Sequence, residues 1–231
     1  MKHLWRYIFI LLGAVILWNQ FLFRPLRILS IFFHKIGHAI GAFAFGHGQD
    51  AFTTTFGSLA DVTIDGRGLF SSLVILNGGY IASGLFSVLL LGLKKTRAKS
   101  FLLGFTAIFF MMASVINTNL QFTWIYAVFY VSAIIILYMI RNDSIDEWVI
   151  DIVGISTITY ITYDTFVNTI LLKINSMLNI VNNWESSVPN DIAKLGELTF
   201  LPDIVWAIIW LLITILIFNF VLIKPSKGRR R

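Results

Sequence analysis

The sequence predicts an all-α polytopic membrane protein with about six transmembrane helices and a short re-entrant or β segment after a histidine-containing helix. Of the 231 residues, 57% are hydrophobic and only 13% are charged, whereas a soluble domain carries roughly 25% charged residues. Charge-free apolar runs cover Gly68–Leu93, Phe101–Ile140 and Ile204–Ile223, each long enough to cross a bilayer. These observations exclude a soluble enzyme, a nucleic-acid-binding domain and a disordered chain.

The N-terminal part contains three predicted elements. Tyr7–Phe23 follows two basic residues and precedes no small-residue cleavage site, so we expect a retained anchor helix. Ile28–Gly46 is apolar except for Lys35 and two histidines, and is the second apolar segment. Ala51–Arg67 contains a threonine run, Val62-Thr63-Ile64 and the turn signal Asp65-Gly66, which together predict short strands.

The rest of the chain predicts four or five further helices. Asn117-Thr118-Asn119 marks a turn between two of them, and no period of 20–50 residues repeats. We expect one integral membrane domain, residues 1–231, with a basic tail at 224–231. The expected helices cover about 71–93, 100–117, 121–140, 148–172 and 201–223.

The positive charges are clustered beside apolar runs. Five of the 18 Lys and Arg residues lie in Lys224–Arg231 and four more in Lys94–Lys99. The positive-inside rule predicts that these segments, and so the C-terminus, face the cytoplasm. Anionic lipid is the expected partner of the basic tail, and nucleic acid is not an expected partner. The same rule permits either a cytoplasmic N-terminus with a re-entrant 28–67 region or an external N-terminus.

The segment His34-Lys35-Ile36-Gly37-His38 carries the main functional signal. Residues i and i+4 lie on one helical face, so both imidazoles can point at one ion. Ionisable groups at membrane depth are costly and mark candidate functional sites. Spacing alone equally permits two interfacial histidines bonded to backbone carbonyls or water.

This segment resembles the His-Glu-x-x-His zinc motif of membrane-embedded metallopeptidases of the site-2-protease superfamily. Asp65-Gly66-Arg67-Gly68 is similar to the Asp-Gly-Ser-Gly turn of that superfamily, and Gly79-Tyr80 to the start of its next helix. Asn190-Asp191, Thr199, Pro202 and two tryptophans follow in the order seen in a small bacterial branch. The resemblance covers about residues 28–93 and 186–215.

The resemblance implies a zinc ion held by His34, His38 and Asp191, a ligand set that leaves one position open for catalysis. It also implies a transmembrane or membrane-proximal polypeptide substrate and a bacterial cytoplasmic membrane location. Read from its own position after Pro189-Asn190, Asp191 is equally a first-turn or capping residue of a helix.

Lys35 departs from the family motif at the position of the Glu that acts as general base. A charged ammonium has three donors and no acceptor, so it cannot take a proton. A buried Lys with a depressed pKa could serve as a base, whereas snorkelling or pairing with Asp191 would leave the site without one. We therefore expect a metallopeptidase-like protein that is catalytically degenerate, a pseudoenzyme.

Other intramembrane chemistries fit less well. Ser83 and Ser156 have no downstream histidine partner, which excludes an intramembrane serine protease. Asp151 and Asp164 lack the Gly-x-Gly-Asp partner motif of aspartyl proteases and are expected to line a polar crevice or to pair with Lys or Arg. The alternative function is a non-enzymatic membrane interaction or transport protein. Its polar network would comprise Lys35, Asp151, Asp164 and Asp191.

Overall fold

The computed structural model describes residues 2–56, 66, 68–94, 96, 98–116, 123–182, 184 and 187–223. Every regular element within those residues is helical, which confirms the predicted all-α class. The elements are α1 (Lys2–Leu17), η1 (Phe21–Phe23), α2 (Arg24–Ala42), η2 (Phe43–His47), α3 (Asp50–Phe56), α4 (Leu69–Leu93), α5 (Lys99–Ile116), α6 (Thr123–Ile140), α7 (Asp143–Thr162), η3 (Tyr163–Leu171), α8 (Leu172–Leu178), α9 (Asn190–Thr199) and α10 (Asp203–Ile223).

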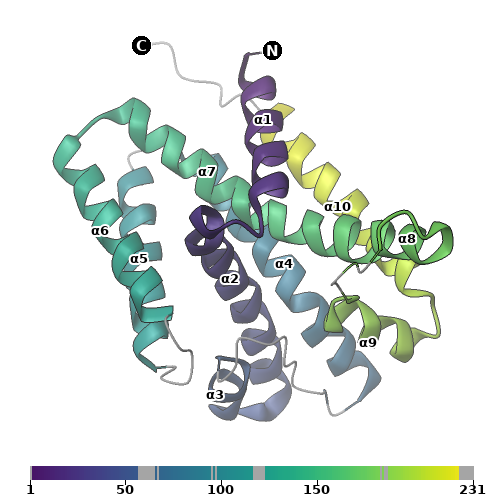
Figure 1. The fold of residues 1–231 in the computed structure, drawn as a ribbon. Helices are drawn as coiled ribbons and strands as arrows, with labels where there is room; N and C mark the ends of the chain where they lie inside the picture. Colours follow the sequence, from purple (N-terminus) through teal and green to yellow (C-terminus); the bar gives the residue numbers. More distant parts are fainter. Residues whose placement is uncertain are drawn as a thin grey trace.

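The helices surround α2, which lies at the centre of the molecule (Figure 1). It packs against α4, α7, α3 and α6. The backbones of α2 and α4 approach closely at Gly37 and Gly78, where a Cβ on Gly78 would lie 2.7 Å from the Gly37 carbonyl oxygen. Small residues allow such contact between membrane helices. The two glycines therefore set the distance between α2 and α4.

The helix α7 continues through the π-helical segment η3 into α8 and crosses the molecule (Figure 1). Its start is determined locally, because the Asn142 side chain accepts hydrogen bonds from the backbone N–H groups of Ser144 and Ile145. The predicted helix at 148–172 lies within this stretch. The structure adds a π-helical segment, a feature that is frequent at functional sites.

The strand prediction for Thr53–Thr55 is wrong, since these residues belong to α3. Thr55 Oγ1 donates to the Ala51 carbonyl oxygen, and Phe56 packs against Phe32 with ring centroids 5.4 Å apart. These contacts outweigh the strand propensity of the threonines. The other strand residues, Val62–Ile64, lie outside the described residues. So do the predicted turn at 117–119 and the tail at 224–231.

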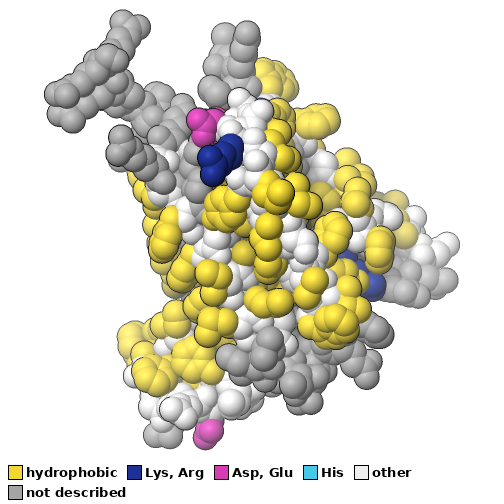
Figure 2. All heavy atoms as spheres, turned by 90° about the vertical axis from the view of Figure 1, so that its left-hand side faces the viewer, with side chains coloured by type: hydrophobic (Ala, Val, Ile, Leu, Met, Phe, Trp, Pro, Cys, Tyr) yellow, Lys and Arg dark blue, Asp and Glu magenta, His cyan; other side chains and the backbone are white. Residues whose placement is uncertain are grey.

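The chain is a membrane protein. Within the described residues, three helical stretches are long and apolar enough to cross a bilayer, namely Phe21–His47, Leu69–Leu93 and Asp203–Phe220. Three shorter apolar helices accompany them, at Trp5–Leu17, Phe101–Met112 and Trp124–Ile140. Figure 2 shows a face on which hydrophobic side chains predominate and few charged ones appear.

Candidate metal centre

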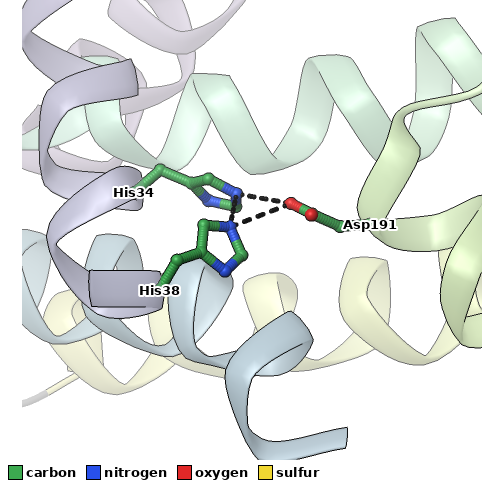
Figure 3. A group of neighbouring side chains, drawn as sticks. All are labelled: His34, His38 and Asp191. Atoms are coloured by element: carbon green, nitrogen blue, oxygen red, sulfur yellow. Dashed lines mark hydrogen bonds and ion pairs between the residues drawn. The ribbon is translucent and has the colours of Figure 1, made fainter. Parts of the chain in front are cut away.

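Two histidines on α2 and one aspartate on α9 converge inside the helix bundle (Figure 3). His34 Nε2 lies 2.8 Å from Asp191 Oδ2, and His38 Nε2 lies 3.0 Å from the same oxygen. The two Nε2 atoms are 2.9 Å apart. Each of the three residues is at most 3% exposed. The structure thus brings together the three predicted ligands, although 153 residues separate His38 from Asp191.

The hydrogen bonding of His38 leaves its Nε2 lone pair directed at this cluster. His38 Nδ1 lies 2.7 Å from the Ile75 carbonyl oxygen, which can only accept, so Nδ1 carries a proton. With Asp191 ionised, no placement of protons on the two Nε2 atoms makes all three contacts of the cluster favourable. In every arrangement of protons, at least one of the three contacts brings together two lone pairs or two N–H groups. A cation would satisfy all three atoms at once, so the donor set fits a metal ion.

Gly79 on α4 provides the space for both imidazoles. A Cβ at this position would lie 2.5 Å from His34 Cε1 and Nε2 and closer still to His38 Nε2. On the opposite side, Asp191 Oδ1 is buried and has no hydrogen-bond partner among the described residues. A buried acceptor without a partner is costly and is consistent with a missing cation. Both observations therefore support a metal ion at this place.

The helix α10 contacts α9, the helix that carries Asp191. Trp206 Nε1 donates to Thr199 Oγ1 at the end of α9, at 2.9 Å. One turn later, Trp210 Nε1 donates to Asn77 Oδ1 on α4, at 3.0 Å. The two tryptophans therefore connect both α9 and α4 to α10. Thr199 and the two tryptophans, which the resemblance singled out in the sequence, thus contact the helices that carry Asp191 and Gly79.

Asp191 lies in the first turn of α9, as its position in the sequence suggested, but it is not the capping residue. Pro189 occupies the N-cap of α9, where no side chain caps the helix, and the Asp191 carboxylate contacts the histidines instead. Burial alone would raise the pKa of Asp191, but the electrostatic interaction with His38 and hydrogen bonding to both imidazoles outweigh burial and lower the pKa below its usual range. The carboxylate is therefore ionised, as a metal ligand must be.

Lys35 lies beside His34 in the sequence but faces another part of the molecule. Its Nζ donates to the Thr55 carbonyl oxygen at the end of α3, at 3.2 Å, and the residue is 6% exposed. The Asp191 carboxylate contacts His34 and His38 instead. The pairing of Lys35 with Asp191 that the sequence allowed is therefore absent from the described residues.

Asp151 belongs to a separate ionic cluster. Its carboxylate lies 2.6 Å from Arg6 Nη2 and 2.8 Å from Lys94 Nζ, which confirms the predicted pairing with Lys or Arg. Lys94 Nζ also donates to the Tyr7 hydroxyl. The cluster therefore links α1, the end of α4 and α7, outside the histidine site.

A cavity of about 650 Å³ lies beside the histidine site. It is lined by Arg27 and Ile31 from α2, by Tyr160 and Asp164, and by Pro189 and Asn190 ahead of Asp191. The Tyr160 ring contacts the His34 ring, with centroids 4.7 Å apart. Asp164 thus lines a polar cavity, as predicted. We call this cavity the chamber.

An all-helical membrane chain that buries two histidines and an aspartate able to hold a metal ion has the features of a membrane metallopeptidase. The model of the Peptidase M50B-like family matches residues 7–221, and the chain therefore belongs to this family within the site-2 proteases. The comparisons with curated proteins and with solved structures found no match.

Sequence reasoning missed several groups around the site. It named Gly79 as part of a family helix, whereas Gly79 also makes room for the imidazoles. It gave no role to the Ile75 carbonyl, which orients His38. The aromatic residues Tyr80 and Tyr160, each 4.7 Å from the His34 ring, were also not predicted. Backbone carbonyls and aromatic packing leave no specific signal in one sequence.

Proposed function

We propose that this protein is a membrane-embedded, zinc-binding relative of the site-2 proteases in which peptide hydrolysis is impaired. The convergence of His34, His38 and Asp191 within 3.0 Å of one another carries the proposal. Two imidazoles and one carboxylate form a typical catalytic zinc ligand set. Zinc bound there would supply Lewis-acid polarisation of a peptide carbonyl and would lower the pKa of water.

The substitution at Lys35 is the basis for the impaired activity. Hydrolysis needs a base that removes a proton from the attacking water, and loss of such a group typically costs about 10²–10⁴-fold in rate. The Lys35 ammonium donates to the Thr55 carbonyl oxygen and has no acceptor of its own. The chain would therefore retain the metal and the substrate while cleaving slowly or not at all.

The wider setting of the proposal is a membrane-spanning chain that acts on polypeptides. Counting three shorter apolar helices with three long ones gives about six spans. The basic segments would then place the C-terminus in the cytoplasm of a bacterial cell, with the tail near anionic lipid. The partner would be a transmembrane or membrane-proximal polypeptide.

The alternative of a transport protein required a shared polar network that included Asp151 and Asp191. Asp151 pairs with Arg6 and Lys94, whereas Asp191 pairs with the two histidines. Because these aspartates belong to separate clusters, the network that motivated the alternative has no support from their contacts.

The test is the metal content of the purified full-length protein. We expect about one zinc per chain, and we expect His34→Ala to remove it, since catalytic zinc needs three protein ligands. The control is His47→Ala, which alters a histidine outside the ligand set. Wild-type protein without zinc after reconstitution would refute the metal assignment.

A second experiment addresses the missing base. Lys35→Glu restores the family motif and should produce cleavage of a model transmembrane substrate that the wild type cleaves slowly or not at all. Lys35→Gln removes the charge without supplying a base, so it is the matched control and should stay inactive. If the wild type already cleaves rapidly and Lys35→Glu leaves the rate unchanged, the proposed degeneracy is wrong.

A further inference from the structure

Among the described residues, the chamber contains a cation, Arg27, without a carboxylate partner. Arg27 is half-buried and lines the chamber. Its Nη1 donates to Asn19 Oδ1 at 2.9 Å, and Asn19 Nδ2 in turn donates to the Tyr163 hydroxyl at 2.6 Å. Within the described part of the chain, Arg27 forms no ion pair, including with Asp164, which also lines the chamber.

Most of the donor capacity of Arg27 therefore remains available. A guanidinium carries five N–H donors, and the bond to Asn19 uses one of them. A partly desolvated cation is costly unless an anion compensates it. The bond to a neutral amide fixes the orientation of the guanidinium but does not neutralise its charge. The arrangement suits a carboxylate that arrives with a ligand.

Arg27 is aligned with the metal ligands along α2. Residues 27, 31, 34 and 38 follow the spacing of one helical face, and Ile31 lines the chamber between Arg27 and His34. Seven residues at 1.5 Å per residue place Arg27 about 10 Å from His34 along the axis. An extended peptide advances about 3.3 Å per residue, so this distance corresponds to about three residues.

The remaining lining favours a polypeptide over a lipid. The polar residues Asn19, Asn168 and Asn190 are among those that line the chamber. Backbone N–H and C=O groups of an unwound segment need such partners at membrane depth, whereas acyl chains do not. One turn of helix, about 10 Å wide and 5.4 Å high, would fill most of the 650 Å³. An extended segment is therefore the better fit.

We propose that the chamber binds an extended segment of the substrate polypeptide and that Arg27 selects an Asp or Glu side chain about three residues from the peptide bond at the histidine site. This inference rests on the proposed function, since it names the substrate feature that the same site would recognise. Arg27 is a specificity-determining residue in this scheme and takes no part in bond cleavage.

The test measures peptide binding, which does not require cleavage. Short fluorescent peptides of Gly, Ala and Ser, identical except for one central Asp, Asn or Lys, are titrated against the full-length protein in neutral detergent. The wild type should bind the Asp peptide about five- to tenfold more tightly than the Asn peptide. Arg27→Gln should abolish this difference, Arg27→Lys should retain part of it, and Arg27→Glu should favour the Lys peptide.

The matched control is Arg24→Gln, which alters an arginine on the same helix whose Nη1 contacts the Tyr126 hydroxyl outside the chamber. This variant should keep the wild-type preference for Asp. Equal binding of the Asp and Asn peptides by the wild type would overturn the proposal. So would an Arg27→Gln variant that weakens binding of phosphatidylglycerol vesicles while leaving peptide selectivity intact.

Zinc content of the same preparations separates the two proposals. Asp selectivity in a protein that never takes up zinc would refute the metal assignment and support the role of Arg27. Stoichiometric zinc without Asp selectivity would refute the role of Arg27 and support the metal assignment.

Discussion

Replacing Gly79 by Ala tests whether the space on α4 is needed for metal binding. The added Cβ would lie 2.5 Å from two atoms of the His34 ring and closer still to His38 Nε2. Ordinary van der Waals contact needs 3.4–4 Å. The rings would therefore have to move by about 1 Å, whereas metal–ligand distances tolerate only about 0.2 Å.

The surroundings leave the rings little freedom to make that movement. His38 is held by the Ile75 carbonyl at 2.7 Å, and the His34 ring packs between Tyr80 and Tyr160. Displacing either imidazole would break these contacts. Disturbing groups that orient metal ligands typically lowers affinity about 10–100-fold, and here both imidazoles are affected. We expect a loss in zinc affinity of about 100-fold or more.

The assay is zinc competition against a chelator with known affinity, together with thermal unfolding in detergent. Overpacking should also cost about 1–3 kcal/mol of stability. The matched control is Gly92→Ala on the same helix, where nothing lies within 4 Å of the added Cβ. Wild-type zinc affinity in a folded Gly79→Ala protein would refute the assigned role of this position.

Two further substitutions probe the contacts around the site. Asp151→Asn leaves the buried Lys94 and the partly buried Arg6 without their counter-charge and should cost about 3–5 kcal/mol in unfolding free energy, measured by denaturant titration, whereas Asp50→Asn on an exposed helix start should cost far less. Lys35→Met keeps the aliphatic stem but removes the donor to Thr55, so limited proteolysis near α3 should accelerate while zinc content stays unchanged. A loss of zinc in Lys35→Met would contradict the separation of Lys35 from the metal site.

The sequence was sufficient for the helical class and for the two histidine candidates, because both depend on local patterns of residues along the chain. Apolar runs without charge require helices in a bilayer, and the spacing of His34 and His38 places them on one face. Asp191 could be linked to them only through family resemblance. No rule of local spacing connects residues that lie 153 positions apart.

The errors arise from contacts between helices, which a single sequence does not reveal. The threonines of α3 have strand propensity, but their helix is held by contacts from α2, which a propensity cannot include. The sequence predicted that Asp151 pairs with a Lys or Arg but not which one. The partners are Arg6 and Lys94 because of where α1 and the end of α4 pack. The chamber arises from three separate segments, so no continuous stretch of sequence encodes it.

The position of Lys35 explains how a metal site can persist beside a cation. Successive residues on a helix are rotated by about 100°, so Lys35 leaves α2 on a different face from His34. Its long stem carries the ammonium to the carbonyl end of α3, where the partial negative charge of the helix terminus compensates it. The Lys35 ammonium, bonded to Thr55, therefore adds no donor to the group of His34, His38 and Asp191. Metal binding and hydrolysis would thus be separable in this chain, and measuring both zinc content and peptide cleavage in Lys35→Glu and Lys35→Gln tests this expectation.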